Sequence, residues 1–92
     1  MAESSVTRSV VLNNKYGLHA RPAAQFVELC NRFESEVLVR KDDQEVNGKN
    51  ILDIMTLGAE PGSRLDLAFN GPDAQAAAQA LVELVESKFG EA

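Results

Sequence analysis

The sequence predicts one small α+β domain with the element order β-α-β-β-α-β-α, and two kinds of apolar spacing carry this prediction. In segments such as 64–69, apolar residues alternate with polar ones, as in a strand that has one covered face. In segments such as 20–32, apolar residues recur at steps of three and four, as on one face of a helix. Alternation in the strands favours a sheet that is covered by helices on one face and exposed to solvent on the other.

The strands are expected at residues 6–12, 36–41, 44–47 and 64–69. Val6, Val10 and Leu12 share one face of the first strand, and Arg8 breaks this pattern. A two-residue acidic turn joins the second strand to the third, so these two read as a hairpin. The last strand alternates most cleanly, and the turn residues 70–72 are expected to end it.

The helices are expected at residues 20–32, 51–57 and 74–88. Asn50 is a good N-cap for the second helix, and Gly58 stands where a left-handed residue often ends one. Asp73 is the expected N-cap of the third helix. The last three residues, 90–92, are expected to fray.

Length and composition predict a single domain over residues 1–92. A chain of this length buries somewhat over ~60% of its unfolded surface, which is enough for one core. The one cysteine, Cys30, lies on the apolar stripe of the first helix, so we expect a buried thiol and no internal disulfide. This cysteine usage fits a reducing cytoplasm. With no Cys/His cluster in the sequence, we expect no bound metal and no cofactor.

Charge and hydropathy exclude two classes of partner. The net charge of −5 argues against a general nucleic-acid binder, which would show a basic footprint. No segment approaches the ~20 apolar residues of a membrane span, so we expect no membrane insertion. The polar start of the chain, residues 1–5, lacks the apolar run of a signal peptide.

One short segment concentrates the chemistry. It holds the only histidine, His19, at or next to the N-cap of a helix expected to start at Ala20. Gly17 permits a tight bend before it, and Pro22 is tolerated in a first helical turn. Such a turn leaves backbone N–H groups free and carries the positive end of the helix dipole, and Arg21 adds a forked cation. A neutral imidazole is a nucleophile, so the pattern suggests a histidine that receives a phosphoryl group. A histidine that only caps the helix or lies on the surface is the alternative.

This segment, Gly17–Ala23, resembles the active-site motif of HPr, the histidine phosphocarrier of the bacterial phosphoenolpyruvate-dependent sugar phosphotransferase system. A second segment, Val46–Ile51 followed by Met55–Gly58, is similar to the family's second-helix region. The resemblance covers roughly residues 6–89. It implies an open-faced β-sandwich, in which four antiparallel strands carry three helices on one face.

The resemblance also implies the chemistry. In HPr-like proteins the phosphoryl group sits on Nδ1 of the histidine, here His19. The backbone N–H groups of Ala20 and Arg21 would face the phosphate oxygens, and the Arg21 side chain would close on them. Enzyme I would be the donor and enzyme IIA domains the acceptors. A monomer is expected, acting as a carrier that needs partner enzymes for turnover and uses no metal or cofactor.

Two positions depart from the family pattern. Tyr16 stands where other members carry a small polar residue, and it either folds over the site, contacts a partner or has no role. Asn50 stands where many Gram-positive members carry a serine that a kinase phosphorylates. Because asparagine has no hydroxyl group, no regulatory serine is expected here.

The second helix has more apolar residues than one buried stripe needs. Ile51, Ile54 and Leu57 fit a core-facing row, while Leu52 and Met55 form a second row turned away from it. The resemblance places the family's partner-binding face in this region. The residues assigned to partner contact are Tyr16, Ile51, Leu52 and Met55. The alternative is that the loop holding Tyr16 covers the second row.

Three functions remain open from the sequence. The first is a carrier in the sugar branch of the system, which the segment 47–49 weakly favours. The second is a carrier in the nitrogen-related branch, which acts mainly in regulation. The third is a non-catalytic regulatory binding module of the same fold, which the presence of both His19 and Arg21 makes the least favoured.

Overall fold

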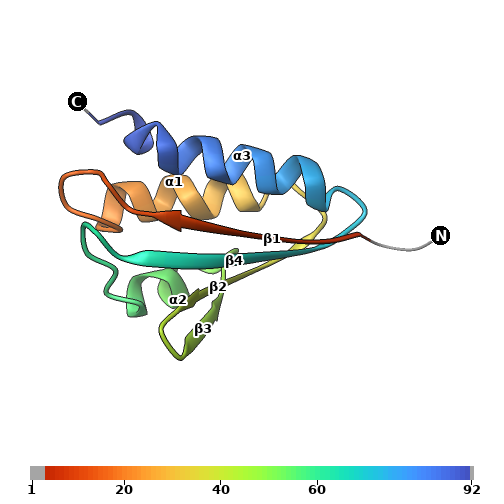
Figure 1. The fold of residues 1–92 in the computed structure, drawn as a ribbon, viewed down its shortest axis with the longest axis horizontal. Helices are drawn as coiled ribbons and strands as arrows, with labels where there is room; N and C mark the ends of the chain where they lie inside the picture. The colour runs from red at the N-terminus through yellow and green to blue at the C-terminus, as the bar shows by residue number, and fades with distance from the viewer. Residues whose placement is uncertain (1–3, 92) are drawn as a thin grey trace.

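Four antiparallel strands form one sheet in the computed structural model, which describes residues 4–91 (Figure 1). The strands are β1 (Ser4–Val11), β2 (Glu36–Lys41), β3 (Gln44–Asn47) and β4 (Arg64–Gly71). Their order across the sheet is β1-β4-β2-β3, so the last strand of the chain lies between the first and the second. This is a split βαβ arrangement.

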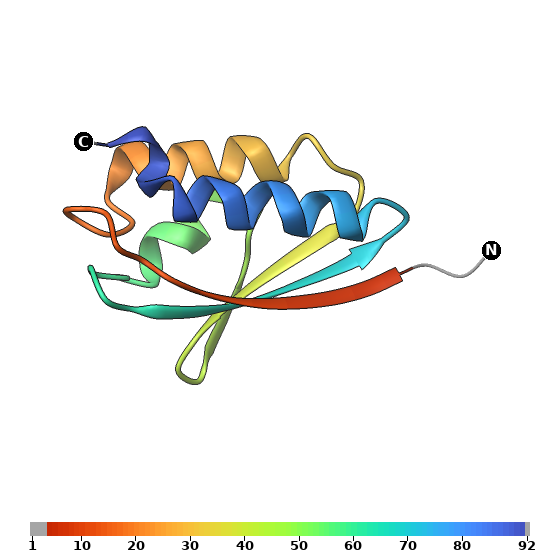
Figure 2. The same cartoon turned by 45° about the horizontal axis from the view of Figure 1, so that its top comes forward.

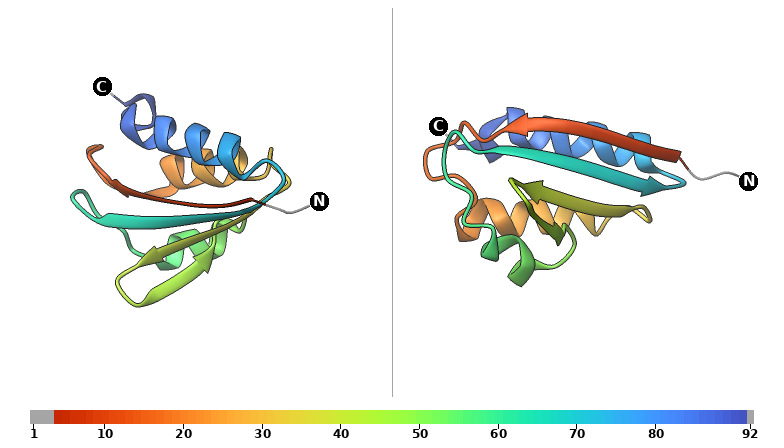
Figure 3. Two further views of the ribbon diagram at one scale, coloured as in Figure 1. Left: turned by 45° about the vertical axis from the view of Figure 1, so that its right-hand side comes forward. Right: turned by 60° about the horizontal axis from the view of Figure 1, so that its bottom comes forward.

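The helices are α1 (Ala20–Cys30), α2 (Ile51–Thr56) and α3 (Ala74–Glu86), followed by the short 3₁₀ turn η1 (Lys88–Gly90). All of them lie on one side of the sheet, and the other side is open (Figures 2 and 3). The predicted α+β open-faced sandwich, with four antiparallel strands and three helices on one face, is therefore confirmed. Among the described residues, no helix is long and apolar enough to cross a membrane.

The core lies between the sheet and the helices. The alternating residues Leu65, Leu67 and Phe69 of β4 all point into it and are buried. Phe26 of α1 is fully buried against this layer, as predicted from the helical spacing. Burial of a side chain of this size contributes roughly 1.5–3 kcal/mol, so these residues hold α1 firmly on the sheet.

Two strands differ from the prediction at their ends. β1 begins at Ser4 and stops at Val11, one residue before the predicted end. β4 continues through Asn70 and Gly71, which were expected to end it, because they pair in register with Ser5 and Ser4 of β1. The turn residues are accommodated in the strand because their backbone groups find partners on β1, which local sequence does not reveal.

Helices α1 and α3 end earlier than predicted. α1 stops at Cys30 instead of Arg32, because the chain tightens into bonds from residue i to residue i−3 at Arg32 and Phe33. α3 stops at Glu86, two residues before the predicted end. The helix α2 also ends one residue early, with Leu57 as its C-cap, and Gly58 follows in the left-handed conformation as predicted (φ 57°).

Asp73 stands at the N-cap of α3 but does not cap it. Its carboxylate instead accepts hydrogen bonds from the backbone N–H groups of Glu34 and Ser35, at 2.9 Å each, and from the Ser35 hydroxyl group at 2.6 Å. The bond from the Ser35 hydroxyl, followed by that from the Glu34 N–H, lowers the pKa of Asp73. This residue therefore ties the start of α3 to the segment that enters β2.

The predicted core-facing row of α2 is wrong at one position. Ile54 and Leu57 are buried, but the side chain of Ile51 is 39% exposed. A step of three residues falls about 60° short of a full turn in a helix with 3.6 residues per turn, so Ile51 lies about 60° from Ile54 and about 120° from Leu57, at the edge of the buried stripe. At the first position of a helix of six residues, this rotation leaves Ile51 at the surface.

Candidate functional site

His19 is the N-cap of α1, as predicted. Its backbone is extended (φ −73°, ψ −178°), and its carbonyl oxygen accepts the first helical bond, from the Ala23 N–H at 2.9 Å. The side chain makes no capping bond, unlike the serine or aspartate that usually stands at this position. The imidazole is therefore not engaged in holding the helix and is available for chemistry.

The loop before His19 is held in place from two sides. The Leu18 N–H donates to the Ala59 carbonyl at 2.9 Å. Gly17 takes a left-handed conformation (φ 67°) and lies so close to the loop after α2 that a Cβ atom there would stand 2.8 Å from the Glu60 Cα. Asn14 is buried, and its side-chain amide donates to the Gly17 carbonyl at 2.7 Å. The bend predicted at Gly17 is thus present and packed.

The first turn of α1 presents donors beside the imidazole. Within residues 4–91, no acceptor meets the backbone N–H groups of Ala20 and Arg21, and no carboxylate pairs with the Arg21 guanidinium. Unpaired N–H groups and the positive end of a helix dipole favour an anion. The structure thus places Ala20 and Arg21, which the sequence assigned to phosphate binding, in the first turn that His19 caps.

Glu91 is a site residue that the sequence analysis missed. Its Oε2 lies 3.0 Å from Nε2 of His19, and its Oε1 accepts from the Asn14 side-chain amide at 3.4 Å and the Lys15 N–H at 3.3 Å. The hydrogen bond with His19 is the main cause that lowers the pKa of Glu91, and the bonds from Asn14 and Lys15 act in the same direction, against desolvation. The carboxylate is therefore ionised at neutral pH.

The end of the chain is folded back to bring Glu91 to the site, which corrects the expectation of a frayed end at residues 90 and 91; Ala92 lies outside the described residues. Lys88 and Phe89 both adopt left-handed conformations, with φ of 59° and 57°. Such a conformation costs a non-glycine residue about 1–2 kcal/mol. Burial of the Phe89 side chain, which is only 4% exposed, offsets this cost.

Tyr16 contacts the imidazole. The two rings meet edge to face, with their centroids 5.7 Å apart, and Lys15 Nζ lies 5.3 Å from the centre of the Tyr16 ring. The Tyr16 side chain is nevertheless 62% exposed. It thus stands beside the site without closing it.

The outer residues of α2 are open to solvent. The side chains of Leu52 and Met55 are 73% and 42% exposed. The alternative in which the loop of Tyr16 covers them is therefore wrong. Together with Ile51 they form an apolar face, and the loop that follows α2 contacts Gly17 beside the imidazole. Asn50 caps this helix by accepting from the Asp53 N–H at 3.1 Å, as predicted.

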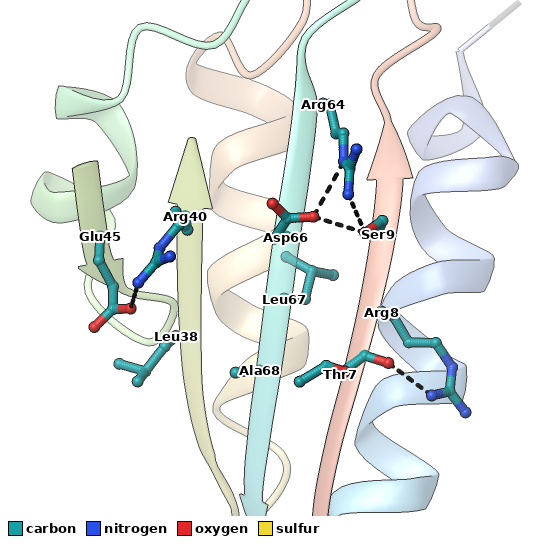
Figure 4. A pocket seen from close by; sticks show the side chains of 10 residues that line it. All are labelled: Thr7, Arg8, Ser9, Leu38, Arg40, Glu45, Arg64, Asp66, Leu67 and Ala68. Atoms are coloured by element: carbon teal, nitrogen blue, oxygen red, sulfur yellow. Dashed lines mark hydrogen bonds and ion pairs between the residues drawn. The ribbon is translucent and has the colours of Figure 1, made fainter. Parts of the chain in front are cut away.

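The imidazole of His19 opens into a pocket of about 450 Å³. The residues that line it are Lys15, Tyr16, His19, Arg21, Gln25, Phe89, Gly90 and Glu91. A second hollow of about 440 Å³ lies on the open face of the sheet (Figure 4). There Arg64 donates to Asp66 and Ser9, and Arg40 donates to Glu45. The third arginine, Arg8, donates to the Thr7 carbonyl. No comparable nucleophile lies in this second hollow, so the site is the pocket at His19.

Within residues 4–91, no group of three or more histidine, cysteine, aspartate or glutamate side chains is arranged to hold a metal ion. Cys30 is fully buried, and burial raises the pKa of its thiol to about 12, so it stays protonated.

Comparison with known proteins gives a consistent result. A family model described as "PTS HPr component phosphorylation site" matches residues 6–87. The phosphocarrier protein HPr of Treponema pallidum is 41% identical over 86 residues, which cover 94% of this chain and 98% of that protein. The HPr-like protein Crh of Halalkalibacterium halodurans is 42% identical over 83 residues, covering 90% of this chain and 99% of its own. A crystal structure of HPr from Thermoanaerobacter tengcongensis superimposes with a TM-score of 0.92 at 46% identity, covering 95% of this chain and 98% of the other.

Proposed function

Because the chain belongs to the HPr family of phosphocarriers, we propose that His19 accepts a phosphoryl group from phosphorylated enzyme I of the phosphotransferase system and passes it to a sugar-specific enzyme IIA component. The observation that supports this proposal best is the position of His19. Its imidazole stands at the N-terminus of α1, next to Arg21 and to backbone N–H groups without an acceptor among residues 4–91.

Phosphoryl transfer depends mainly on positioning and on neutralising charge. The Ala20 and Arg21 N–H groups and the Arg21 guanidinium supply donors for the oxygens of the transferring group. A charge-assisted hydrogen bond contributes roughly 1.5–3 kcal/mol. A carrier must also release the group to its acceptor, so a small number of such bonds at an open site is appropriate. No general base is needed, since the neutral imidazole attacks through its lone pair.

The test is a transfer assay with purified enzyme I and phosphoenolpyruvate. Intact mass should show one added phosphoryl group per chain, and the modification should be lost in acid, as expected for a phosphohistidine. Addition of enzyme IIA should then remove the group from this chain. If several enzymes I leave the chain unmodified under conditions in which they phosphorylate another HPr, the carrier function is refuted.

Replacing Arg21 by alanine should slow transfer without unfolding the protein, because the Arg21 side chain is exposed. Losing one charge-assisted contact of roughly 1.5–3 kcal/mol in the transition state lowers the rate by about one to two powers of ten. Arg21→Lys should recover only part of the rate, because lysine lacks the planar fork. Stopped-flow or quench-flow kinetics with phosphorylated enzyme I measure the rate. Arg32→Ala, which removes an exposed arginine beyond the other end of α1, is the control. A transfer rate in Arg21→Ala equal to that of the wild type would place this residue outside the site.

We also propose that the apolar face of α2 (Ile51, Leu52 and Met55), with Tyr16, binds enzyme I and the acceptors. These side chains are exposed on a helix whose following loop contacts Gly17, next to His19. Large apolar residues on a surface favour protein contacts, and the flexible Met55 suits a surface that must fit several partners.

A charge in this face should weaken binding. Leu52→Glu or Met55→Glu should raise the Kd for enzyme I by at least about tenfold, since a buried glutamate without a partner is costly. Calorimetry measures the Kd once circular dichroism has shown that the variants fold. Val11→Glu is a matched control, because Val11 is an exposed apolar residue (54%) outside this face. Unchanged Kd values in both α2 variants would remove this helix from the docking surface.

One alternative has support from the relatives. They include the HPr-like protein Crh, which a solution structure describes as the catabolite repression HPr of Bacillus subtilis, and this description favours the regulatory binding module. A module would bind its partner without being phosphorylated, so the transfer assay separates it from a carrier. A nitrogen-branch carrier would be phosphorylated as well, but by the enzyme I of that branch in preference to that of the sugar branch. A side-by-side assay with the two donors distinguishes the branches.

The expected monomer stays a prediction. One solved relative is described as an HPr dimer from Thermoanaerobacter tengcongensis, and it is 49% identical to this chain. In this chain the edge strand β1 carries an exposed charge at Arg8, and a charge on an edge strand disfavours pairing between edges. Sedimentation equilibrium over a range of concentrations should therefore give the monomer mass.

A further inference from the structure

We propose that Glu91, held in place by Asn14, is a positioning residue for phosphoryl transfer: it keeps a proton on Nε2 of His19 and leaves the lone pair of Nδ1 to attack phosphorus. This inference rests on the proposed function and deepens it. It assigns a role to the end of the chain, which lies 72 residues away from the histidine in sequence.

The contact is built by the fold and is not the result of a loose tail. Phe89 is buried in the core and fixes the last turn of the chain, with both Lys88 and Phe89 in left-handed conformations. Both carboxylate oxygens of Glu91 have donors: Oε2 faces His19, and Oε1 faces Asn14 and the Lys15 N–H. A carboxylate that meets three separate donors is held in a defined orientation.

The state of the imidazole follows from this contact. An ionised carboxylate only accepts hydrogen bonds, so Nε2, which lies 3.0 Å from Oε2, must be the nitrogen that carries the proton. A neutral imidazole has one N–H, so Nδ1 then holds the lone pair. The same logic applies where a carboxylate orients a catalytic or metal-binding histidine through its other nitrogen.

The transfer step then balances without a further base. The Nδ1 lone pair forms the N–P bond, and the bond from phosphorus to the donor's leaving atom breaks, with its electron pair going to the donor. The ring gains a positive charge, while the proton stays on Nε2. The negative charge of Glu91 lies 3.0 Å from that nitrogen and stabilises the charged ring. Transfer to the acceptor runs through the same arrangement in reverse, so no net proton is exchanged.

Asn14 has a supporting part in this arrangement. Its side-chain amide joins the Gly17 carbonyl to Glu91 Oε1, so it links the bend before His19 to the end of the chain. It is almost fully buried, at 3% exposure, and its carbonyl oxygen Oδ1 has no hydrogen-bond partner within residues 4–91. A buried acceptor without a partner lowers the stability of the fold. Asn14 nevertheless occupies this position, and its side-chain amide makes both of its hydrogen bonds at the site.

The experiment uses the full chain and three variants of the proposed residues. Glu91→Ala removes the carboxylate, Glu91→Gln keeps an acceptor without the charge, and Asn14→Ala removes the support. Nitrogen-15 NMR of the His19 ring, at a pH at which the ring is neutral, reports the tautomer. Quench-flow kinetics report transfer from phosphorylated enzyme I. Glu86→Ala, an exposed glutamate at the end of α3, is the control.

The wild-type protein should show a proton on Nε2 and a free Nδ1. In Glu91→Ala, the share of the Nδ1–H tautomer should rise severalfold, and the transfer rate should fall by about tenfold, corresponding to 1.36 kcal/mol. Glu91→Gln should keep the Nε2–H tautomer but recover only part of the rate. Asn14→Ala should add little to Glu91→Ala in the double variant, because both act through one contact.

Two results would overturn the inference. One is a wild-type tautomer and a wild-type rate in Glu91→Ala. The other is an additive loss in the double variant, which would show that Asn14 supports only the loop. Neither affects the proposed function, since wild-type protein would still be phosphorylated. A failure of the proposed function itself would appear as an unmodified wild-type chain in the same assay.

Discussion

Alanine in place of His19 is expected to give a folded protein that accepts no phosphoryl group at all. His19 is the only imidazole in the chain, and the buried Cys30 thiol is not available as a nucleophile. The fold should survive because the His19 side chain makes no capping bond with α1, and among the described residues its one hydrogen bond goes to Glu91.

Intact mass after incubation with phosphorylated enzyme I measures this result. Circular dichroism and the thermal midpoint should match those of the wild type closely, which separates lost chemistry from lost structure. A phosphoryl group retained on the folded His19→Ala variant would assign the acceptor to another residue.

Gly17→Ala is expected to cause the largest loss of stability among the variants at the site. The backbone at Gly17 has a φ of 67°, and the left-handed region costs a non-glycine residue about 1–3 kcal/mol. The added Cβ would also meet the backbone of Ala59 and Glu60, which has no flexible side chain to move aside. Overpacking of this kind costs a further ~1–3 kcal/mol. The expected loss is therefore about 2–6 kcal/mol, a large part of the ~5–15 kcal/mol that stabilises a small domain.

Transfer should also slow in Gly17→Ala, because relief of the clash moves the loop that carries His19. Chemical denaturation measures the free energy of unfolding, and quench-flow measures the rate. Gly58→Ala is the matched control: its φ of 57° is similar, but nothing lies within 4 Å of the new Cβ. If Gly17→Ala lowers the free energy of unfolding no more than Gly58→Ala does, the close contact with Ala59 and Glu60 does not contribute to the loss of stability.

Elements whose signals are local could be predicted from the sequence. The strands β2 and β3 begin and end where the alternation and the acidic turn place them. Asn50 caps α2 and Gly58 ends it, because each acts on backbone groups within a few residues of itself. The position of His19 at the start of α1 belongs to the same class, since Gly17 and Pro22 mark that boundary from both sides.

What could not be predicted depends on partners far along the chain. Asn70 and Gly71 look like turn residues, yet they extend β4 because β1 pairs with them. Asp73 looks like a helix cap, yet its carboxylate binds the segment before β2. In both cases the local preference is real, and a contact formed only in the folded protein outweighs it.

Glu91 is the clearest example at the site. Three polar or small residues at the end of a chain are typical of fraying, and nothing in their composition points to a histidine 72 residues away. One signal was present: Phe89, a large apolar residue three positions after the end of α3, indicates a buried anchor. An anchored residue followed by glycine allows the chain to turn back, and here it brings the carboxylate to His19.

His19 is expected to receive the phosphoryl group on Nδ1, and phosphorus–nitrogen NMR of the phosphorylated, nitrogen-15-labelled chain tests this expectation most directly. We expect a single phosphorus resonance coupled to Nδ1 of His19, with the proton on Nε2 facing Glu91. Coupling to Nε2 would contradict the arrangement of the site, and phosphorus bound to any other residue would contradict the account as a whole.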